Sequence, residues 1–110
     1  MIANTLHRHL LERITSRTAH IGVIGLGYVG LPLAVEFARQ GFTVSGFDVD
    51  ESKTSQINAG KSYIPDVSEK ELADVVTSGH LRATCRMAEL ANMDVIDICV
   101  PTPLRKTSPQ

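Results

Sequence analysis

The chain has 110 residues, of which 43% are hydrophobic and 21% are charged, and its net charge is −1. These values are typical of one globular domain with its own core, and the near-neutral charge gives no indication of a nucleic-acid partner. No apolar run approaches the ~20 residues needed to span a bilayer, so we expect no membrane partner. With two cysteines and no signal-peptide pattern, the sequence predicts a cytoplasmic protein.

The first predicted element is an amphipathic helix over about residues 4–17. Leu6, Leu10 and Ile14 recur there at helical spacing, and the residues between them are mostly polar. We therefore expect residues 1–18 to form a leading helix that packs outside the main core.

Strands and helices alternate through residues 19–110, which we take as the domain proper. Strands are expected at residues 20–24, 43–47, 81–84 and 94–100, and helices at residues 28–40, 51–59, 69–78 and 86–91. Such alternation predicts parallel pairing with right-handed crossovers. We expect an α/β, Rossmann-type sheet in the order 3-2-1-4 with flanking helices.

Several helix boundaries carry explicit capping signals. Asp50 is a predicted N-cap, and Ser68 with Glu71 has the spacing of a capping box. Gly60 and Gly79 are predicted to end the two helices that these caps begin.

The most informative motif follows the first strand directly and reads Gly25-x-Gly27-x-x-Gly30; the second strand then ends in Asp48. A strand, three glycines, a helix, a second strand and a terminal acid form the dinucleotide-binding fingerprint. The glycines respectively permit a tight turn, backbone approach to the pyrophosphate, and close helix packing. The helix expected from near Tyr28 would direct unpaired N–H groups at the phosphates. Tight packing without a ligand is the alternative interpretation.

Asp48 also bears on which cofactor is expected. A carboxylate there can accept hydrogen bonds from adenosine ribose hydroxyls, whereas it would repel the 2′-phosphate of NADP by roughly 4 kcal/mol at ~4 Å. NAD is therefore the expected cofactor. Lys53 is a further candidate for the same pocket, and a solvated lysine on the next helix is its alternative reading.

Residues 21–34 (IGVIGLGYVGLPLA) resemble the opening of the UDP-glucose/GDP-mannose dehydrogenase family. Residues 46–50 (GFDVD), 58–64 (NAGKSYI) and 100–103 (VPTP) fit the same pattern, so the resemblance spans about residues 10–104. The leading helix and the Ser-Tyr-Ile loop look most like the bacterial branch that oxidises UDP-N-acetylhexosamines.

This resemblance implies NAD-dependent, two-step oxidation of a sugar C6 alcohol to a carboxylate, for surface polysaccharide synthesis. The family's catalytic cysteine, lysine and asparagine lie far beyond this length. We therefore expect no catalytic residue here, no turnover by this fragment alone, and a UDP-sugar substrate only in the full-length enzyme. Cys85 and Cys99 are predicted to be small core hydrophobes.

No metal site is expected. The expected cofactor-binding residues are Gly25, Gly27, Tyr28, Val29, Gly30, Asp48, Lys53, Val100, Pro101 and Thr102.

The fourth strand raises two further expectations. It would form an open edge, which predicts a homodimer in which this strand meets its copy. Asp97 interrupts its apolar run, so either this carboxylate finds a partner or that face of the sheet is open.

Two other functions remain open on the sequence. One is the cofactor domain of a β-hydroxyacid or 6-phosphogluconate-type dehydrogenase, which the Pro101-Thr102-Pro103 run argues against. The other is a stand-alone, non-catalytic nucleotide-binding module, which the short length favours.

Overall fold

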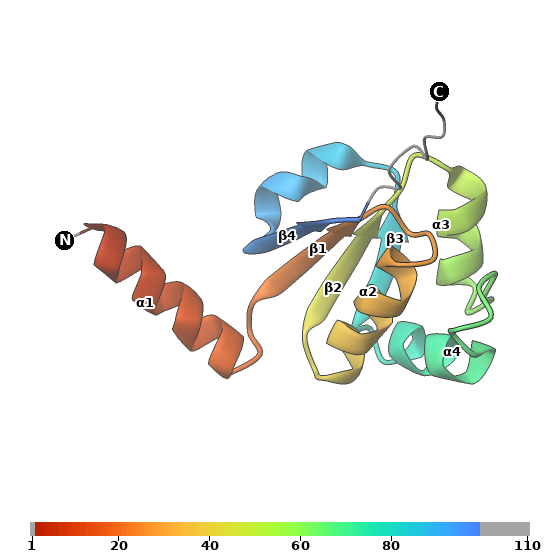
Figure 1. The fold of residues 1–110 in the computed structure, drawn as a ribbon, viewed down its shortest axis with the longest axis horizontal. Helices are drawn as coiled ribbons and strands as arrows, with labels where there is room; N and C mark the ends of the chain where they lie inside the picture. The colour runs from red at the N-terminus through yellow and green to blue at the C-terminus, as the bar shows by residue number, and fades with distance from the viewer. Residues whose placement is uncertain (1, 100–110) are drawn as a thin grey trace, which may run out of the picture.

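A computed structural model describes residues 2–99 (Figure 1). In chain order its elements are α1 (Ile2–Thr15), β1 (His20–Ile24), α2 (Gly30–Arg39), β2 (Thr43–Phe47), α3 (Glu51–Asn58), α4 (Glu69–Thr77), β3 (Leu81–Thr84), the 3-10 helix η1 (Met87–Asn92) and β4 (Val95–Ile98). Within the described range, none of these helices has the length and apolar character needed to cross a membrane.

The four strands form one parallel sheet in the order β3-β2-β1-β4, which confirms the predicted topology. β1 pairs with β2 along its full length, and this pairing ends with Ile24 opposite Phe47. The next residue of each strand therefore lies at the same edge. Gly25 and Asp48 are brought together in this way, although they are far apart in the sequence.

The predicted caps are present and define where α3 and α4 begin and end. The Asp50 side chain accepts from the backbone N–H two residues further on, at 2.9 Å. Ser68 and Glu71 make both hydrogen bonds of a capping box. Gly60 and Gly79 follow the two helices with φ values of +76° and +85°, which glycine adopts without strain.

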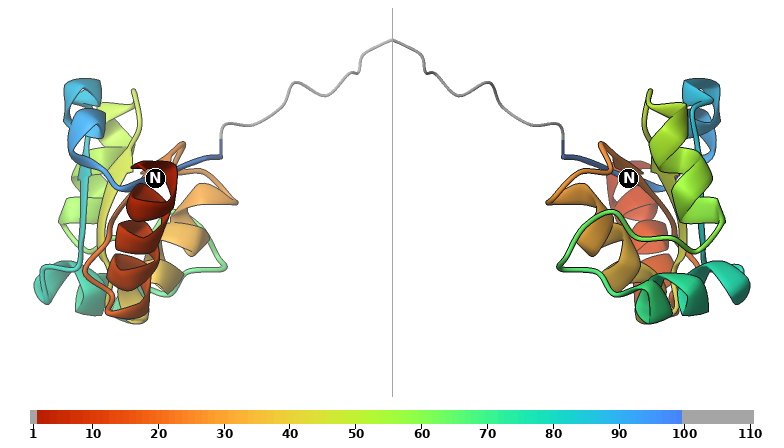
Figure 2. Two further views of the ribbon diagram at one scale, coloured as in Figure 1. Left: turned by 90° about the vertical axis from the view of Figure 1, so that its left-hand side faces the viewer. Right: turned by 90° about the vertical axis from the view of Figure 1, so that its right-hand side faces the viewer.

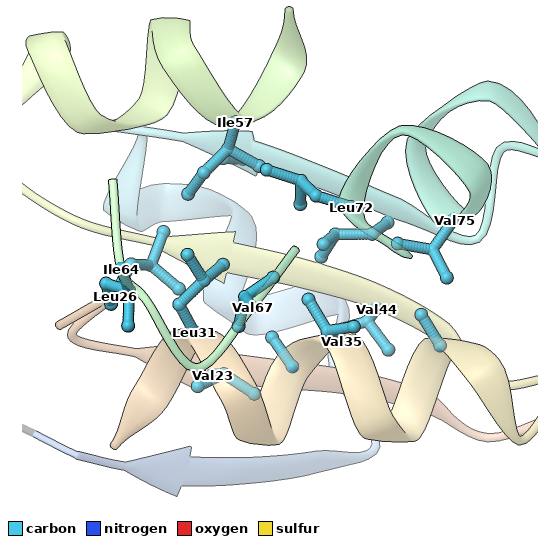
Figure 3. Close-up of a cluster of buried hydrophobic side chains, with 14 of the residues drawn as sticks. Val23, Leu26, Leu31, Val35, Val44, Ile57, Ile64, Val67, Leu72 and Val75 are labelled. Carbon is cyan, nitrogen blue, oxygen red and sulfur yellow. The ribbon is translucent and has the colours of Figure 1, made fainter. Parts of the chain in front are cut away.

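The core lies between the sheet and the layer of α2, α3 and α4 (Figure 3). It comprises Ile21, Val23, Leu26, Leu31, Ala34, Val35, Ala38, Val44, Ile57, Ile64, Val67, Leu72, Val75, Leu81 and Ala83. Three of these, Leu26, Ile64 and Val67, come from loops rather than helices or strands. The core thus includes loops near the ends of the strands.

The opposite face of the sheet has a thinner cover. Figure 2 shows η1 and α2 on opposite sides of the strands. Met93, which follows η1, packs so closely on Gly22 that a Cβ at this glycine would lie 2.8 Å from the methionine Cγ. Phe47 is fully buried on this side, and a salt bridge joins Arg82 to Glu89.

A polar cluster closes the amino-terminal end of the sheet. His20 Nε2 lies 3.0 Å from the hydroxyl of the fully buried Ser45. Asp94 accepts from the His20 backbone N–H at 2.7 Å and pairs with Arg13 of α1 at 2.8 Å. Burial and, next, the nearby Arg82 guanidinium lower the pKa of His20.

Several element boundaries differ from the sequence prediction. α1 spans Ile2–Thr15 rather than residues 4–17, β4 spans Val95–Ile98 rather than residues 94–100, and α3 and α4 each end one residue earlier than predicted. α2 begins at Gly30 rather than Tyr28. The Leu31 N–H already donates to the Gly27 carbonyl at 3.1 Å, but Pro32 has no N–H to donate to the next carbonyl, so the series of helical hydrogen bonds is interrupted in this turn. The short helix before β4 is a 3-10 helix, Met87–Asn92, and lies one residue later than predicted.

Within residues 2–99, β4 forms one edge of the sheet and leaves Ile96 and Ile98 45% and 65% exposed. Asp97 points to the other face, opposite Val23 in register, and accepts from the Cys99 thiol at 3.7 Å. Burial first, and the Asp97 carboxylate second, raise the pKa of this thiol. Within the described residues, the Cys99 thiol is thus a weak hydrogen-bond donor to Asp97, which is itself only partly buried.

Candidate dinucleotide-binding site

The turn between β1 and α2 is shaped by its first and third glycines. Gly25 has a φ of +91°, which permits the sharp exit from the strand. A Cβ at Gly30 would lie 1.6 Å from the Gly25 carbonyl oxygen, so only glycine allows α2 to start this close to the strand. A Cβ at Gly27 would meet nothing within 4 Å. The space beside the second glycine is therefore open.

The same turn offers unpaired donors. Among residues 2–99, no protein acceptor receives a hydrogen bond from the backbone N–H groups of Gly27, Tyr28 or Val29. The side chains of Tyr28 and Val29 are 74% and 68% exposed. These N–H groups lie just before α2, where the helix dipole is positive. Free donors, positive potential and open space together suit a diphosphate.

Asp48 directly follows β2, and its carboxylate accepts hydrogen bonds from two backbone N–H groups. Its Oδ2 accepts from the Leu26 N–H and its Oδ1 accepts from the Asp50 N–H, each at 2.9 Å. An ionised carboxylate has about four lone-pair sites, so capacity remains for ribose hydroxyls. Asp48 therefore connects the predicted ribose site to the glycine turn, a link that the sequence motif does not reveal.

Two adjoining pockets lie at this end of the sheet. The first, of about 360 Å³, is lined by Ile24, Gly25, Phe47, Asp48, Val49, Asp50, Lys53 and Met87. The second, of about 230 Å³, is lined by Gly27, Tyr28, Lys53, Tyr63 and Ile64. The first lies in the range of small-ligand pockets, and the second extends the cavity toward the glycine turn.

Lys53 lines both pockets, and its Nζ lies 6.0 Å from the centroid of the Tyr63 ring. Within the described part of the chain it forms no salt bridge. Because Lys53 has no counter-ion among the described residues and lines both pockets, its charge is well placed for a phosphate or ribose.

Sequence reasoning did not assign Tyr63, Val49 or Met87 to the site. The Tyr63 hydroxyl donates to the Leu26 carbonyl oxygen at 2.5 Å. Burial first, then the nearby carboxylates of Asp48 and Asp50, raise the pKa of this phenol, so it remains a donor at neutral pH. Residues 58–64 resemble the family pattern, but their sequence does not indicate that the Tyr63 hydroxyl contacts the glycine turn.

Other predicted residues contribute less. Val100, Pro101 and Thr102 lie outside the described residues. Cys85 and Cys99 are free and partly buried rather than fully buried, and Cys85 lies 3.6 Å from Thr54 Oγ1. Across residues 2–99 there is no cluster of three or more metal-ligating side chains.

The arrangement fits NAD on structural grounds. The open space beside Gly27 admits a group that any side chain there would displace. The unpaired N–H groups suit its phosphates, and the acid at the end of β2 suits an unphosphorylated ribose.

The family model for the UDP-glucose/GDP-mannose dehydrogenase NAD-binding domain matches residues 19–109. Among curated proteins, the chain is 40% identical over 91 residues to UDP-N-acetyl-D-mannosamine dehydrogenase of Pyrococcus horikoshii, covering 81% of this chain and 22% of that protein. It is 37% identical over 84 residues to UDP-N-acetyl-D-glucosamine 6-dehydrogenase of Pseudomonas aeruginosa, covering 76% and 19%. The chain thus spans about a fifth of the length of these relatives.

Solved structures agree with these matches. The UDP-N-acetylmannosamine dehydrogenase of Pyrococcus horikoshii superposes with a TM-score of 0.72 at 40% identity, over 78% of this chain and 21% of that structure. A ternary complex of GDP-mannose dehydrogenase from Pseudomonas aeruginosa gives 0.70 at 38% identity, over 78% and 20%.

Proposed function

Because the chain belongs to the UDP-glucose/GDP-mannose dehydrogenase family as an NAD-binding domain, we propose that it holds NAD in a nucleotide-sugar 6-dehydrogenase. The substrate is UDP-glucose or a UDP-N-acetylhexosamine, and the curated relatives favour the latter. The enzyme converts the sugar C6 alcohol to a carboxylate for surface polysaccharide synthesis. The observation that carries the proposal is the convergence of Gly27, Asp48 and Lys53 on two adjoining pockets.

Each of these groups has a separate task in binding. The N–H groups of Gly27, Tyr28 and Val29 bind the pyrophosphate, and the positive end of α2 lowers the cost of its charge. Asp48 accepts from the adenosine ribose hydroxyls, and Lys53 lies between the two subsites. Bound NAD supplies the acceptor for the hydride that leaves C6 of the sugar.

The adenosine half of the cofactor is the half that this chain recognises. We expect NADH to bind the 110-residue chain weakly, ADP-ribose to compete with it, and nicotinamide mononucleotide not to compete. NADPH should bind less tightly, because its 2′-phosphate would face Asp48. Equal affinity for NADH and NADPH would remove Asp48 from the ribose role.

The chain alone should turn over no UDP-sugar. NADH fluorescence during incubation with NAD and UDP-glucose or UDP-N-acetylglucosamine tests this directly, and any NADH formation would contradict the expectation. Reading the coding DNA beyond codon 110 separates the proposal from a stand-alone module. A continuing frame with a Gly-x-Cys-x-x-Lys-Asp-like segment would support a dehydrogenase.

A further inference from the structure

The glycine turn is held by a residue from a distant loop. Tyr63 lies between α3 and α4 and is 37 positions away from Leu26, whose carbonyl oxygen receives its hydroxyl hydrogen bond at 2.5 Å. The loop itself is fixed, since its neighbouring residues Ile64 and Val67 are 4% exposed. Tyr63 therefore reaches the turn from a well-packed support.

The acceptor of this hydrogen bond belongs to a peptide group that matters for the cofactor. The Leu26 carbonyl and the Gly27 N–H belong to one planar trans peptide, so they point in opposite directions. A hydroxyl that fixes the carbonyl therefore fixes the N–H as well. The preceding peptide is fixed separately, because the Leu26 N–H donates to Asp48 at 2.9 Å.

We propose that Tyr63 is a positioning residue for NAD, whose hydroxyl holds the Leu26–Gly27 peptide with its N–H facing the pyrophosphate space. This proposal rests on the proposed function, since it explains how the NAD site is ordered before NAD binds. Without this hydrogen bond the peptide is free to rotate, because glycine at position 27 tolerates φ values that other residues avoid. Binding would then require the peptide to be reordered.

Leu26 is held in place by other contacts, so the Tyr63 hydrogen bond should orient only the Leu26–Gly27 peptide and not the whole turn. The Leu26 side chain is fully buried, and a Cβ at Gly46 would lie 2.9 Å from its Cδ2. Core packing and Asp48 thus retain the residue itself. Loss of the Tyr63 hydroxyl should leave the turn in place and release only the peptide that follows Leu26.

The test replaces Tyr63 by phenylalanine in the 110-residue chain and measures NADH affinity by fluorescence. Tyr63→Phe should bind NADH about three- to tenfold more weakly, which is the effect of losing one hydrogen bond. Ser78→Ala is the control, because it removes a hydroxyl that bonds the Val75 carbonyl at 3.0 Å and His80 Nδ1 at 2.8 Å, in the turn that follows α4. This control should lose comparable stability but retain the NADH affinity of the unaltered chain.

Two further measurements separate positioning from a general structural role. Replacement of Tyr63 by 4-aminophenylalanine restores a donor on the same ring and should restore NADH affinity. In the absence of cofactor, the Gly27 amide resonance should shift in Tyr63→Phe, while amides of α4 stay unchanged.

The outcomes distinguish the two proposals. If the unaltered chain does not bind NADH, the proposed function fails, and the cofactor-free Gly27 amide measurement still tests whether Tyr63 orders this peptide. If the unaltered chain binds and Tyr63→Phe binds equally well, the positioning role is wrong. The role is equally wrong if Ser78→Ala weakens binding as much, or if the 4-amino variant behaves like phenylalanine.

Discussion

The Leu26 N–H donates to the Asp48 carboxylate at 2.9 Å, so the residue that ends β2 holds the turn that leaves β1. The two halves of the dinucleotide fingerprint are therefore in direct contact within the protein itself. A change at Asp48 alters both the expected ribose contact and the shape of the glycine turn.

Asp48→Ala should weaken NADH binding by about 1.5–3 kcal/mol, the range for a hydrogen bond to a charged group. The discrimination against NADPH should shrink at the same time, because the repulsive carboxylate is gone. Titration calorimetry with both cofactors measures the two effects. Asp74→Ala, at an exposed carboxylate of α4, is the control; unchanged NADH affinity in Asp48→Ala would contradict the ribose assignment.

Gly27→Val should abolish NADH binding while leaving a folded domain. The valine side chain would fill the open space beside the turn, yet it would meet no protein atom within 4 Å of its Cβ. The free energy of unfolding should therefore change by no more than ~0.5 kcal/mol. Urea unfolding and NADH titration of the same sample check this, and retained affinity would place the phosphates elsewhere.

Gly30→Ala, unlike Gly27→Val, should strongly lower the free energy of unfolding. Its new Cβ would lie 1.6 Å from the Gly25 carbonyl oxygen, so α2 must move away from β1. We expect a loss of about 3 kcal/mol, at the upper end for overpacking. Equal stabilities of the Gly27→Val and Gly30→Ala variants would contradict the assignment of close helix packing to Gly30 and of open space to Gly27.

Acidification should destabilise the chain partly through His20. Burial lowers the pKa of this side chain below its ordinary value of 6.5, so the folded state favours the neutral ring. This stabilising contribution is complete above the unfolded pKa and is lost as the pH falls through the lower folded value.

Urea unfolding at about pH 8 and about pH 5 measures this contribution. The loss of stability on acidification should be smaller in His20→Gln than in the unaltered chain, whereas His9→Gln, on the exposed side of α1, should leave it unchanged. Equal losses in all three proteins would exclude His20 as the titrating group.

We expect the chain to self-associate through the edge formed by β4, where Ile96 and Ile98 are exposed. Ile98→Lys should shift sedimentation toward the monomer. Leu11→Lys tests the competing possibility that α1 mediates association, since Leu11 is 49% exposed. A monomer at high concentration, or monomers produced by Leu11→Lys alone, would contradict association through β4.

The sheet order, the bounds of its first three strands and the starts of α3 and α4 could be predicted because their signals are local. The strands 20–24, 43–47 and 81–84 were bounded correctly, and the first two are followed directly by Gly25 and Asp48. Asp50 and Ser68 likewise mark the starts of α3 and α4, because each caps N–H groups only two or three residues away. The start of α2 was predicted too early, because Pro32 in its first turn has no N–H and interrupts the helical hydrogen bonds there.

The long-range polar contacts could not be predicted. Tyr63 contacts Leu26 only because the loop after α3 folds back over the carboxyl end of the sheet. The partner of Asp97, Cys99, lies only two residues away in the sequence, but the face to which both point depends on the register with β1. Such contacts follow from tertiary packing, which a single sequence does not specify residue by residue.

Leu26, Ile64 and Val67 place the loops of the cofactor site inside the hydrophobic core. The site therefore cannot open by a local, low-energy fluctuation, because opening would expose the same apolar surface that global unfolding exposes. The hydrogen-bonded amides of its turn, those of Gly25 and Leu26, should exchange with solvent on the timescale of whole-domain unfolding, and NAD should raise the melting temperature of the entire domain. Heating would then abolish cofactor affinity and the fold in a single cooperative transition.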